Sequence, residues 1–352
     1  MSYKILTLND SKEWSDLLAK LPEDQQDIYY TPEYYSLYEN YGDGKAMCFV
    51  FEKDGGIALY PFLINSVNAL GYNLDKEYYD IQGAYGYNGV VSSSYEPSFI
   101  KEFYSEFNSF CADNNIIAEF TRFNPLMNNY IFSKNNYIIL FDRKTVYVDL
   151  SYNIDDIKSD FSSSTKRAIK KAQKNNLYLK VFENNSSLRE IFITLYKETM
   201  NRVGSDSYLY FNKKYFDRLF AINNVVQFLV EFESKPIASS ICFYSKNYFH
   251  YHLGASNKEH LNNRPNDLLF EEMIKFGKYK NCKYLHFGGG TSSEEGDSLL
   301  KFKKGFSKSY LDFYIGKRML NQNIYDEVVK QWELKYPDKT EKYKNFLLKY
   351  RY

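Results

Sequence analysis

Cysteine is scarce in this sequence and scattered along it. Only four cysteines stand among the 352 residues. None forms a CxxC pair or joins a histidine at metal-ligand spacing, so the sequence predicts neither a zinc site nor a disulfide framework. We expect all of them to be small buried core residues, and they are Cys48, Cys111, Cys242 and Cys282.

Long apolar runs and a large net charge are also missing. No stretch approaches the ~20 apolar residues that a bilayer-spanning helix needs, and the N-terminal MSYKILTLNDSKEW lacks a basic segment followed by an apolar one. With 45 basic and 44 acidic residues the net charge is +1, which does not indicate a dedicated DNA-binding protein. We therefore expect a cytoplasmic protein, in which local basic patches still allow contact with a membrane surface.

The length predicts two domains, since 352 residues exceed one ordinary hydrophobic core. Residues 1–150 show helices, a hairpin, a helix and a strand, and residues 151–320 repeat that order at greater length. We expect an α/β protein with the seam at residues 149–160. The charged segment 321–352 is expected to add a helix, over 322–348, packed on the outside.

The most informative stretch runs over residues 247–306. It predicts a strand, a polar loop, an amphipathic helix, a second strand that stops at three glycines, and a short helix ending on Phe302 and Lys303. Gly288, Gly289 and Gly290 allow close approach of a backbone or a ligand. A strand–helix–strand unit with a polar loop at its mouth is where α/β folds place ligands.

Three other segments carry candidate features. Residues 78–91, YYDIQGAYGYNGVV, read either as a fixed loop with aromatic walls or as a surface turn, rather than as a regular strand or helix. Arg122, at the end of a strand and beside a proline turn, is placed either to hold a carboxylate or phosphate or simply to be solvated. The helix TKRAIKKAQK, residues 165–174, is either an attractor for a phosphate-bearing partner or a solvated basic face.

Five motifs follow one another along the chain. DIQGAYGYNGVV, AEFTRFNPLMNN and FSSSTKRAIKKAQKNNLYLKV are followed by the unit from FHYHLGAS to YLHFGGG and by LLKFKKGF. In this order they resemble the FemABX-like branch of the GNAT N-acyltransferase superfamily, which includes the peptidoglycan-bridge aminoacyltransferases. In the second motif Asn124 stands where the family usually has histidine. This resemblance implies two tandem GNAT-like domains, the first degenerate, with mixed sheets flanked by helices and a cleft between them.

The resemblance also implies a donor and partners, but this sequence departs from the family pattern in two features. Residues 256–266, where acyl-CoA enzymes usually carry a glycine loop for the pyrophosphate, contain no glycine. No heptad run matches the long arm of relatives that use aminoacyl-tRNA. Either aminoacyl-tRNA or acyl-CoA remains the donor substrate, no further cofactor is implied, and the acceptor is a nucleotide- or lipid-linked envelope precursor.

Amide formation needs stabilisation of a tetrahedral oxyanion, and no Ser–His–acid or Cys–His pattern is present. We therefore expect direct attack without a covalent enzyme intermediate. Lys303 is the candidate for oxyanion stabilisation, unless it is simply a surface lysine. His252 is a candidate general base with a near-neutral pKa, unless it is a hydrogen-bonded sheet histidine.

The expected substrate-binding residues fall into three groups. Asp80, Tyr85 and Tyr87 would position an acceptor sugar or amine, and Arg122 and Arg167 would bind its phosphates. Asn266 would bind substrate or cap its helix. Phe302 completes the set as the neighbour of Lys303.

Three functions remain open at this stage. The first is an acyl- or aminoacyltransferase that forms an amide on an amino sugar or peptide of a cell-envelope precursor. The second is an acyl-CoA-dependent N-acetyltransferase of a sugar nucleotide. The third is a non-catalytic binding protein with a degenerate GNAT fold.

Overall fold

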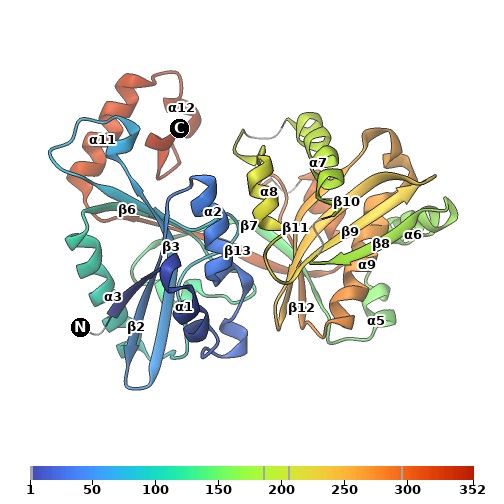
Figure 1. Ribbon diagram of the computed structural model, residues 1–352, viewed down its shortest axis with the longest axis horizontal. Helices are drawn as coiled ribbons and strands as arrows, with labels where there is room; N and C mark the ends of the chain where they lie inside the picture. Colours follow the sequence, from blue (N-terminus) through green and yellow to red (C-terminus); the bar gives the residue numbers. More distant parts are fainter. Residues whose placement is uncertain (1–2, 185–186, 205–206, 295) are drawn as a thin grey trace. The chain divides into compact units, whose positions relative to one another are not determined.

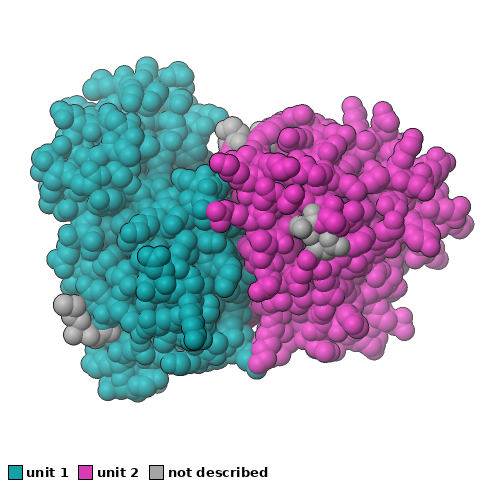
Figure 2. Space-filling view, in the orientation of Figure 1, with its two compact units in different colours: residues 1–142, 313–352 teal, residues 143–312 magenta. Residues whose placement is uncertain are grey.

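The computed structural model describes residues 3–184, 187–204, 207–294 and 296–352. The chain forms two compact units, residues 1–142 with 313–352 and residues 143–312 (Figure 2). The expected class, an α/β protein of two tandem units with mixed sheets flanked by helices, is confirmed. The observed division differs from the expected boundaries, because the second unit begins before residue 151 and residues 313–352 return to the first unit.

The sheet of the first unit contains six strands that pair in succession. All neighbours are antiparallel except β4 and β6, which are parallel. The order is β1 (Tyr3–Thr7), β2 (Lys45–Lys53), β3 (Gly56–Ser66), β4 (Tyr79–Gln82), β6 (Ile116–Arg122) and β13 (Ser309–Met319), with β5 (Val91–Ser92) beside β3.

The sheet of the second unit repeats this arrangement. Again all neighbours are antiparallel except the fourth and fifth, β11 and β12. The order is β8 (Tyr178–Glu183), β9 (Val225–Phe232), β10 (Lys235–Tyr244), β11 (Tyr248–Ser256), β12 (Tyr284–Gly288) and β7 (Ile138–Asp149). In both units a helix joins the parallel pair, α3 (Pro97–Asp113) in the first and α9 (Pro265–Tyr279) in the second. The sixth strand of each sheet comes from the other part of the chain. β7 follows the strands of the first unit in sequence but pairs with β12 of the second, and β13 follows the strands of the second unit but pairs with β6 of the first.

Local signals position the helices of the first unit. α1 spans Ser11–Leu18, and α2 spans Pro32–Tyr41. The Thr31 side chain caps α2, Pro32 is its first residue, and Gly42 ends it at a φ of 103°. Along α3, Phe103 and Phe107 recur at helical spacing, and their rings lie 5.4 and 5.1 Å from that of Phe49 on β2.

In the second unit α9 packs into the core. Its residues Leu269, Met273 and Phe276 pack with the sheet residues Phe228 and Phe249 in one buried cluster. Figure 1 shows α9 near α5 (Ile154–Ser159) and α6 (Ser163–Lys174), with α7 (Arg189–Val203) and α8 (Lys213–Leu219) grouped separately. The break between α5 and α6 lies at residues 160–162, where a run of three serines begins: Ser162, Ser163 and Ser164.

Three expectations about elements were wrong. The helix expected over 322–348 is interrupted, because α11 (Gln322–Lys335) stops two residues before Pro337 and only the short α12 (Thr340–Tyr343) follows. Trp332 of α11 is fully buried, so this segment belongs to the core of the first unit. Residues 79–82, expected to be irregular, form β4.

The remaining general expectations concern cysteine and membrane spans. All four cysteines are buried, as expected of core residues. Within the described ranges, no helix combines the length and apolar character that crossing a bilayer requires. In the same ranges no three His, Cys, Asp or Glu side chains are grouped so that they could hold a metal ion.

Candidate active site

Lys303 lies on the buried side of α10 (Ser298–Lys304) and is 5% exposed. Its Nζ atom donates a hydrogen bond of 2.7 Å to the carbonyl oxygen of Gly289. The same atom lies 5.4 Å from the centre of the Tyr251 ring on β11, a cation–π distance. Lys303 is therefore a buried lysine held between the glycine turn and β11, and the surface alternative is wrong.

The glycines after β12 are required by close approach. A Cβ atom on Gly290 would lie 2.3 Å from Oδ1 of Asp297, and one on Gly289 would lie 2.8 Å from Cδ of Arg143. Gly288 has a φ of 76°, which favours glycine. The turn can pack against α10 only because these side chains are absent.

Asp297 caps α10 and organises the turn. Its carboxylate accepts hydrogen bonds from the backbone N–H groups of Leu300 at 2.8 Å, Thr291 at 2.9 Å and Ser292 at 3.1 Å. Burial would raise the pKa of Asp297, but these hydrogen bonds and the one from the Thr291 hydroxyl hold that pKa well below its usual range. Asp297 is therefore a fixed negative charge beside Lys303.

The charge of Lys303 is finely balanced. Burial lowers the pKa of its ammonium to about 7, against the attraction of Asp297 and with the repulsion of Arg143. Arg143 itself donates a hydrogen bond of 2.9 Å to the carbonyl of Gly290. Lys303 therefore loses its proton more readily than a solvent-exposed lysine does.

Two buried histidines lie next to this group. The parallel ladder of β11 and β12 ends at His250 and His286, whose ring centres are 5.8 Å apart. Burial, with the charges of His250 and Lys303, holds the pKa of His286 well below its usual range. Tyr251 follows His250 directly along β11, and Gly289 comes three residues after His286.

His252 does not have the near-neutral pKa expected of a general base. Burial and the charge of His250 lower its pKa to about 3. Its Nε2 atom lies 3.3 Å from the Tyr215 hydroxyl, and its ring lies 4.4 Å from that of Phe243. His252 is a neutral sheet histidine with a hydrogen bond to α8, which is the alternative left open above.

The other expected residues of the second unit serve packing or solvent contact. The Phe302 ring lies 4.9 Å from Phe270 and 5.4 Å from Phe306, so it supports α10. Asn266 does not cap α9, because the N-cap is Arg264 and makes no side-chain cap bond; Asn266 is the second residue of the helix. Arg167 is exposed on α6.

The expected residues of the first unit are engaged within that unit. Asp80 is fully buried and accepts hydrogen bonds of 2.9 Å from the Tyr350 hydroxyl and from Nε of Arg351. The Tyr87 ring packs edge-on against Tyr29 and Phe313, at 5.3 and 5.5 Å. Asp80 therefore anchors the last residues of the chain rather than presenting a carboxylate to solvent.

Tyr85 and Arg122 are half-buried. The Tyr85 carbonyl accepts a hydrogen bond from the Tyr34 hydroxyl. The guanidinium of Arg122 lies 5.2 Å from the centre of the Phe120 ring, and its backbone N–H donates to the side chain of Asn88. A phosphate-binding role for Arg122 stays a prediction.

Sequence reasoning missed three groups around Lys303. The sequence does contain a signal for Asp297, because Asp is a common N-cap residue and Asp297 directly precedes the helix that begins at Ser298. Tyr251 stands between the two histidines that drew attention instead. Arg143 lies far away in the sequence, and nothing in its local pattern indicates its place beside the turn.

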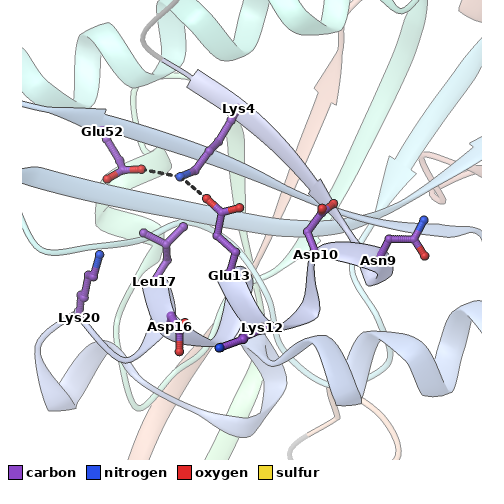
Figure 3. A pocket seen from close by; sticks show the side chains of 9 residues that line it. All are labelled: Lys4, Asn9, Asp10, Lys12, Glu13, Asp16, Leu17, Lys20 and Glu52. Atoms are coloured by element: carbon purple, nitrogen blue, oxygen red, sulfur yellow. Dashed lines mark hydrogen bonds and ion pairs between the residues drawn. The ribbon is translucent and has the colours of Figure 1, made fainter.

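Two of the surface hollows formed by the described residues contain no residue of this group. The first, about 460 Å³, is lined in the first unit by charged side chains of β1, β2 and α1 (Figure 3). Lys4 there pairs with Glu13 at 2.6 Å and Glu52 at 2.8 Å. The second, about 510 Å³, lies at the ends of β8 and β9. The paired charges of the first hollow give no indication of a ligand.

Part of the second unit matches a family model. Residues 159–304 match the acetyltransferase (GNAT) domain, and this segment contains α6, β11, α9, β12 and α10. The expected resemblance to the GNAT superfamily is thereby confirmed. No curated protein sequence matches the chain.

Solved structures resemble the chain over nearly its whole length. FemX has 14% identity and a TM-score of 0.68, with 93% of this chain and 99% of that chain covered. L-PGS from Bacillus licheniformis has 13% identity and a TM-score of 0.58, with coverages of 88% and 92%. The C-terminal domain of a putative lysylphosphatidylglycerol synthetase from Agrobacterium fabrum has 11% identity and a TM-score of 0.56, with coverages of 93% and 96%. At these identities the likeness concerns the fold, and it is the FemABX-like fold expected from the motifs.

Proposed function

We propose that this protein is an acyltransferase that transfers an acyl or aminoacyl group to an amino group of a cell-envelope precursor. The observation that carries the proposal is Lys303. It is a buried cation beside a glycine turn, at the end of a parallel ladder, within the segment that matches an acetyltransferase domain. A charge in such a water-poor place acts strongly on a developing negative charge.

The proposed reaction is direct aminolysis. The lone pair of the acceptor amine attacks the carbonyl carbon of the donor, the C–N bond forms, and the carbonyl π electrons move to oxygen. The Lys303 ammonium has three N–H donors, of which Gly289 takes one, so others remain for the oxyanion. When the oxyanion collapses, the bond to the leaving group breaks, and the proton of the amine passes to that leaving oxygen or sulfur.

The start of α9 favours an aminoacyl ester over acyl-CoA as the donor. Pro265 is the first residue of α9 and has no N–H, and the preceding residues 256–264 contain no glycine. Asp267 is buried in the first turn, and burial raises its pKa to about 6 against the charge of Arg264. A helix start with a missing donor and an acid is a poor place for a pyrophosphate.

The structural relatives support an envelope precursor as acceptor. The name lysylphosphatidylglycerol synthetase describes a protein that joins a lysyl group to a membrane phospholipid. FemX covers the same share of this chain, 93%, with a higher TM-score, 0.68 against 0.56. We propose for this chain an amino sugar or peptide acceptor that is linked to a nucleotide or a lipid.

The test is amide formation by the wild type and the Lys303→Ala variant. Purified protein is incubated with aminoacyl-tRNA or acetyl-CoA and with extracted envelope precursors, and new amides are measured by mass spectrometry. We expect product with aminoacyl-tRNA, and a loss of roughly 100- to 1,000-fold in Lys303→Ala. Lys301→Ala, on the exposed side of the same helix, is the matched control and should keep full activity. Equal activity of Lys303→Ala and wild type, or no product from the wild type with any donor, would contradict the proposal.

A further inference from the structure

The solvent face of α6 is basic throughout. Between Ser162 and Asn175 its buried residues are Thr165, Ile169 and Ala172, which pack on the body of the second unit. The long exposed side chains of the helix, apart from Gln173, are all cationic: Lys166, Arg167, Lys170, Lys171 and Lys174. We call these five residues the α6 basic face.

The α6 basic face is not neutralised by neighbouring acids. The sequence contains no Asp or Glu from residue 161 to residue 182. The acids that border α6 pair with lysines elsewhere: Asp160 with Lys308 at 2.7 Å, and Glu271 of the neighbouring α9 with Lys158 at 2.6 Å. Across the described residues no ion pair involves the five cations, and Lys166 donates only to the carbonyl of Ser159.

We infer that the α6 basic face docks on the surface of an anionic phospholipid membrane. Each Lys or Arg near such a surface contributes through attraction that fades within about a Debye length, ~8–10 Å at moderate salt. The flexible stems of lysine let all five charges reach a flat layer of headgroups together. Binding of this kind is reversible and weakens as salt rises.

A lipid surface suits this face better than a nucleic acid does. The exposed side of α6 carries no aromatic ring, whereas sites for single-stranded nucleic acid combine cations with aromatic platforms for the bases. An anionic headgroup layer attracts a dense array of positive charge and requires no aromatic ring.

The N-terminal end of α6 contacts the C-terminal end of α10, the helix that contains Lys303. The backbone N–H of Ser162, the N-cap of α6, donates a hydrogen bond of 2.9 Å to the carbonyl of Gly305, directly after α10. A Cβ atom on Gly305 would lie 2.3 Å from Oγ1 of Thr165, so the two helices meet closely. Docking would hold α10 near the membrane and thus near a lipid-linked acceptor. That consequence rests on the proposed function, whereas the docking itself does not.

The test is co-sedimentation of the full chain with vesicles. Wild-type protein is mixed with vesicles containing about 30% phosphatidylglycerol in phosphatidylcholine, or phosphatidylcholine alone, at low and high salt. The first variant replaces the α6 basic face by glutamine. The control replaces five exposed lysines of the first unit by glutamine: Lys12, Lys20, Lys101, Lys134 and Lys330. Circular dichroism confirms that both variants are folded.

We expect the wild type and the control to bind anionic vesicles at low salt, with little binding to neutral vesicles or at high salt. The α6 variant should bind at least roughly 100-fold more weakly. Equal binding by the α6 variant, or no vesicle binding by the wild type, would overturn the inference. Binding of bulk tRNA that depends on the α6 basic face, without vesicle binding, would assign this face to nucleic acid instead. Amide formation on a soluble acceptor is measured separately, so failure of docking and failure of the proposed reaction are distinguishable.

Discussion

The Nζ atom of Lys303 lies 2.7 Å from the carbonyl oxygen of Gly289, and this hydrogen bond joins α10 to the turn that ends β12. The bond keeps a lysine in a place where burial lowers its pKa to about 7. It fixes a partly charged nitrogen next to Tyr251 and close to the His250–His286 pair.

The buried ammonium makes stability depend on pH. Because the unfolded lysine keeps a pKa near 10.5 while the folded one has about 7, the unfolded state binds more protons between these values. The unfolding free energy of the wild type therefore rises with pH across this window, and Lys303 adds no pH dependence below it. In Lys303→Met this rise is absent, so the stability of the variant relative to wild type should fall by on the order of 3–5 kcal/mol from pH ~6 to ~10.

Urea unfolding of both proteins across that range measures the difference. Lys301→Met is the matched control, because Lys301 is exposed, and its difference from wild type should stay constant with pH. A constant difference for Lys303→Met would show that the pKa of Lys303 is not lowered.

Asp297→Ala should weaken α10 and change the titration of Lys303. Loss of the cap costs about 1–2 kcal/mol. The negative charge of Asp297 raises the pKa of Lys303, so removing that charge lowers the pKa of Lys303 further. Asn321→Ala removes the cap of α11 in the first unit and should cost similar stability without that shift. An unchanged pH profile of the relative unfolding free energy in Asp297→Ala would contradict the coupling.

Gly290→Ala should be destabilising, and Gly296→Ala should be tolerated. The added methyl group at position 290 would lie 2.3 Å from Oδ1 of Asp297, whose carboxylate is fixed by several hydrogen bonds, whereas nothing lies within 4 Å of one at position 296. We expect a loss of about 1–3 kcal/mol at position 290 and little change at 296. Thermal unfolding measures the stability of the two variants. Equal melting temperatures for Gly290→Ala and Gly296→Ala would contradict this prediction.

The ion pair of Asp80 and Arg351 should stabilise the first unit. Both side chains are largely buried, and removal of one partner leaves the other charge uncompensated. We expect Arg351→Ala to lower the unfolding free energy by about 3–5 kcal/mol. Lys349→Ala, two residues earlier, should change it little. If Arg351→Ala is as stable as wild type, Asp80 is available for the substrate-binding role that the sequence suggested.

Much of the fold could be predicted from local signals. Thr31 and Pro32 define the start of α2, and the serine run separates α5 from α6. The exchange of β7 and β13 could not be predicted, because strand neighbours depend on pairing across the whole sheet. The end of α11 could have been predicted, because Pro337 disfavours a helical conformation in the residue before it.

The candidate site was predicted only in part. Lys303 and the glycine turn follow from a motif and from backbone conformation, which are local properties. The low pKa of His252 and the engagement of Asp80 depend on burial and on the distant residues His250 and Arg351. Side chains far apart in the sequence decide both, so a linear pattern contains no direct signal for them.

The most direct test of the central claim compares the rate of amide formation by the wild type and by Lys303→Arg as a function of pH. Arginine stays protonated throughout, and titration of the acceptor amine affects both proteins equally, so it cancels in the ratio of rates. If the Lys303 ammonium stabilises the oxyanion, the ratio of wild type to Lys303→Arg falls as pH rises through about 7. A ratio that does not change across this range would contradict the claim.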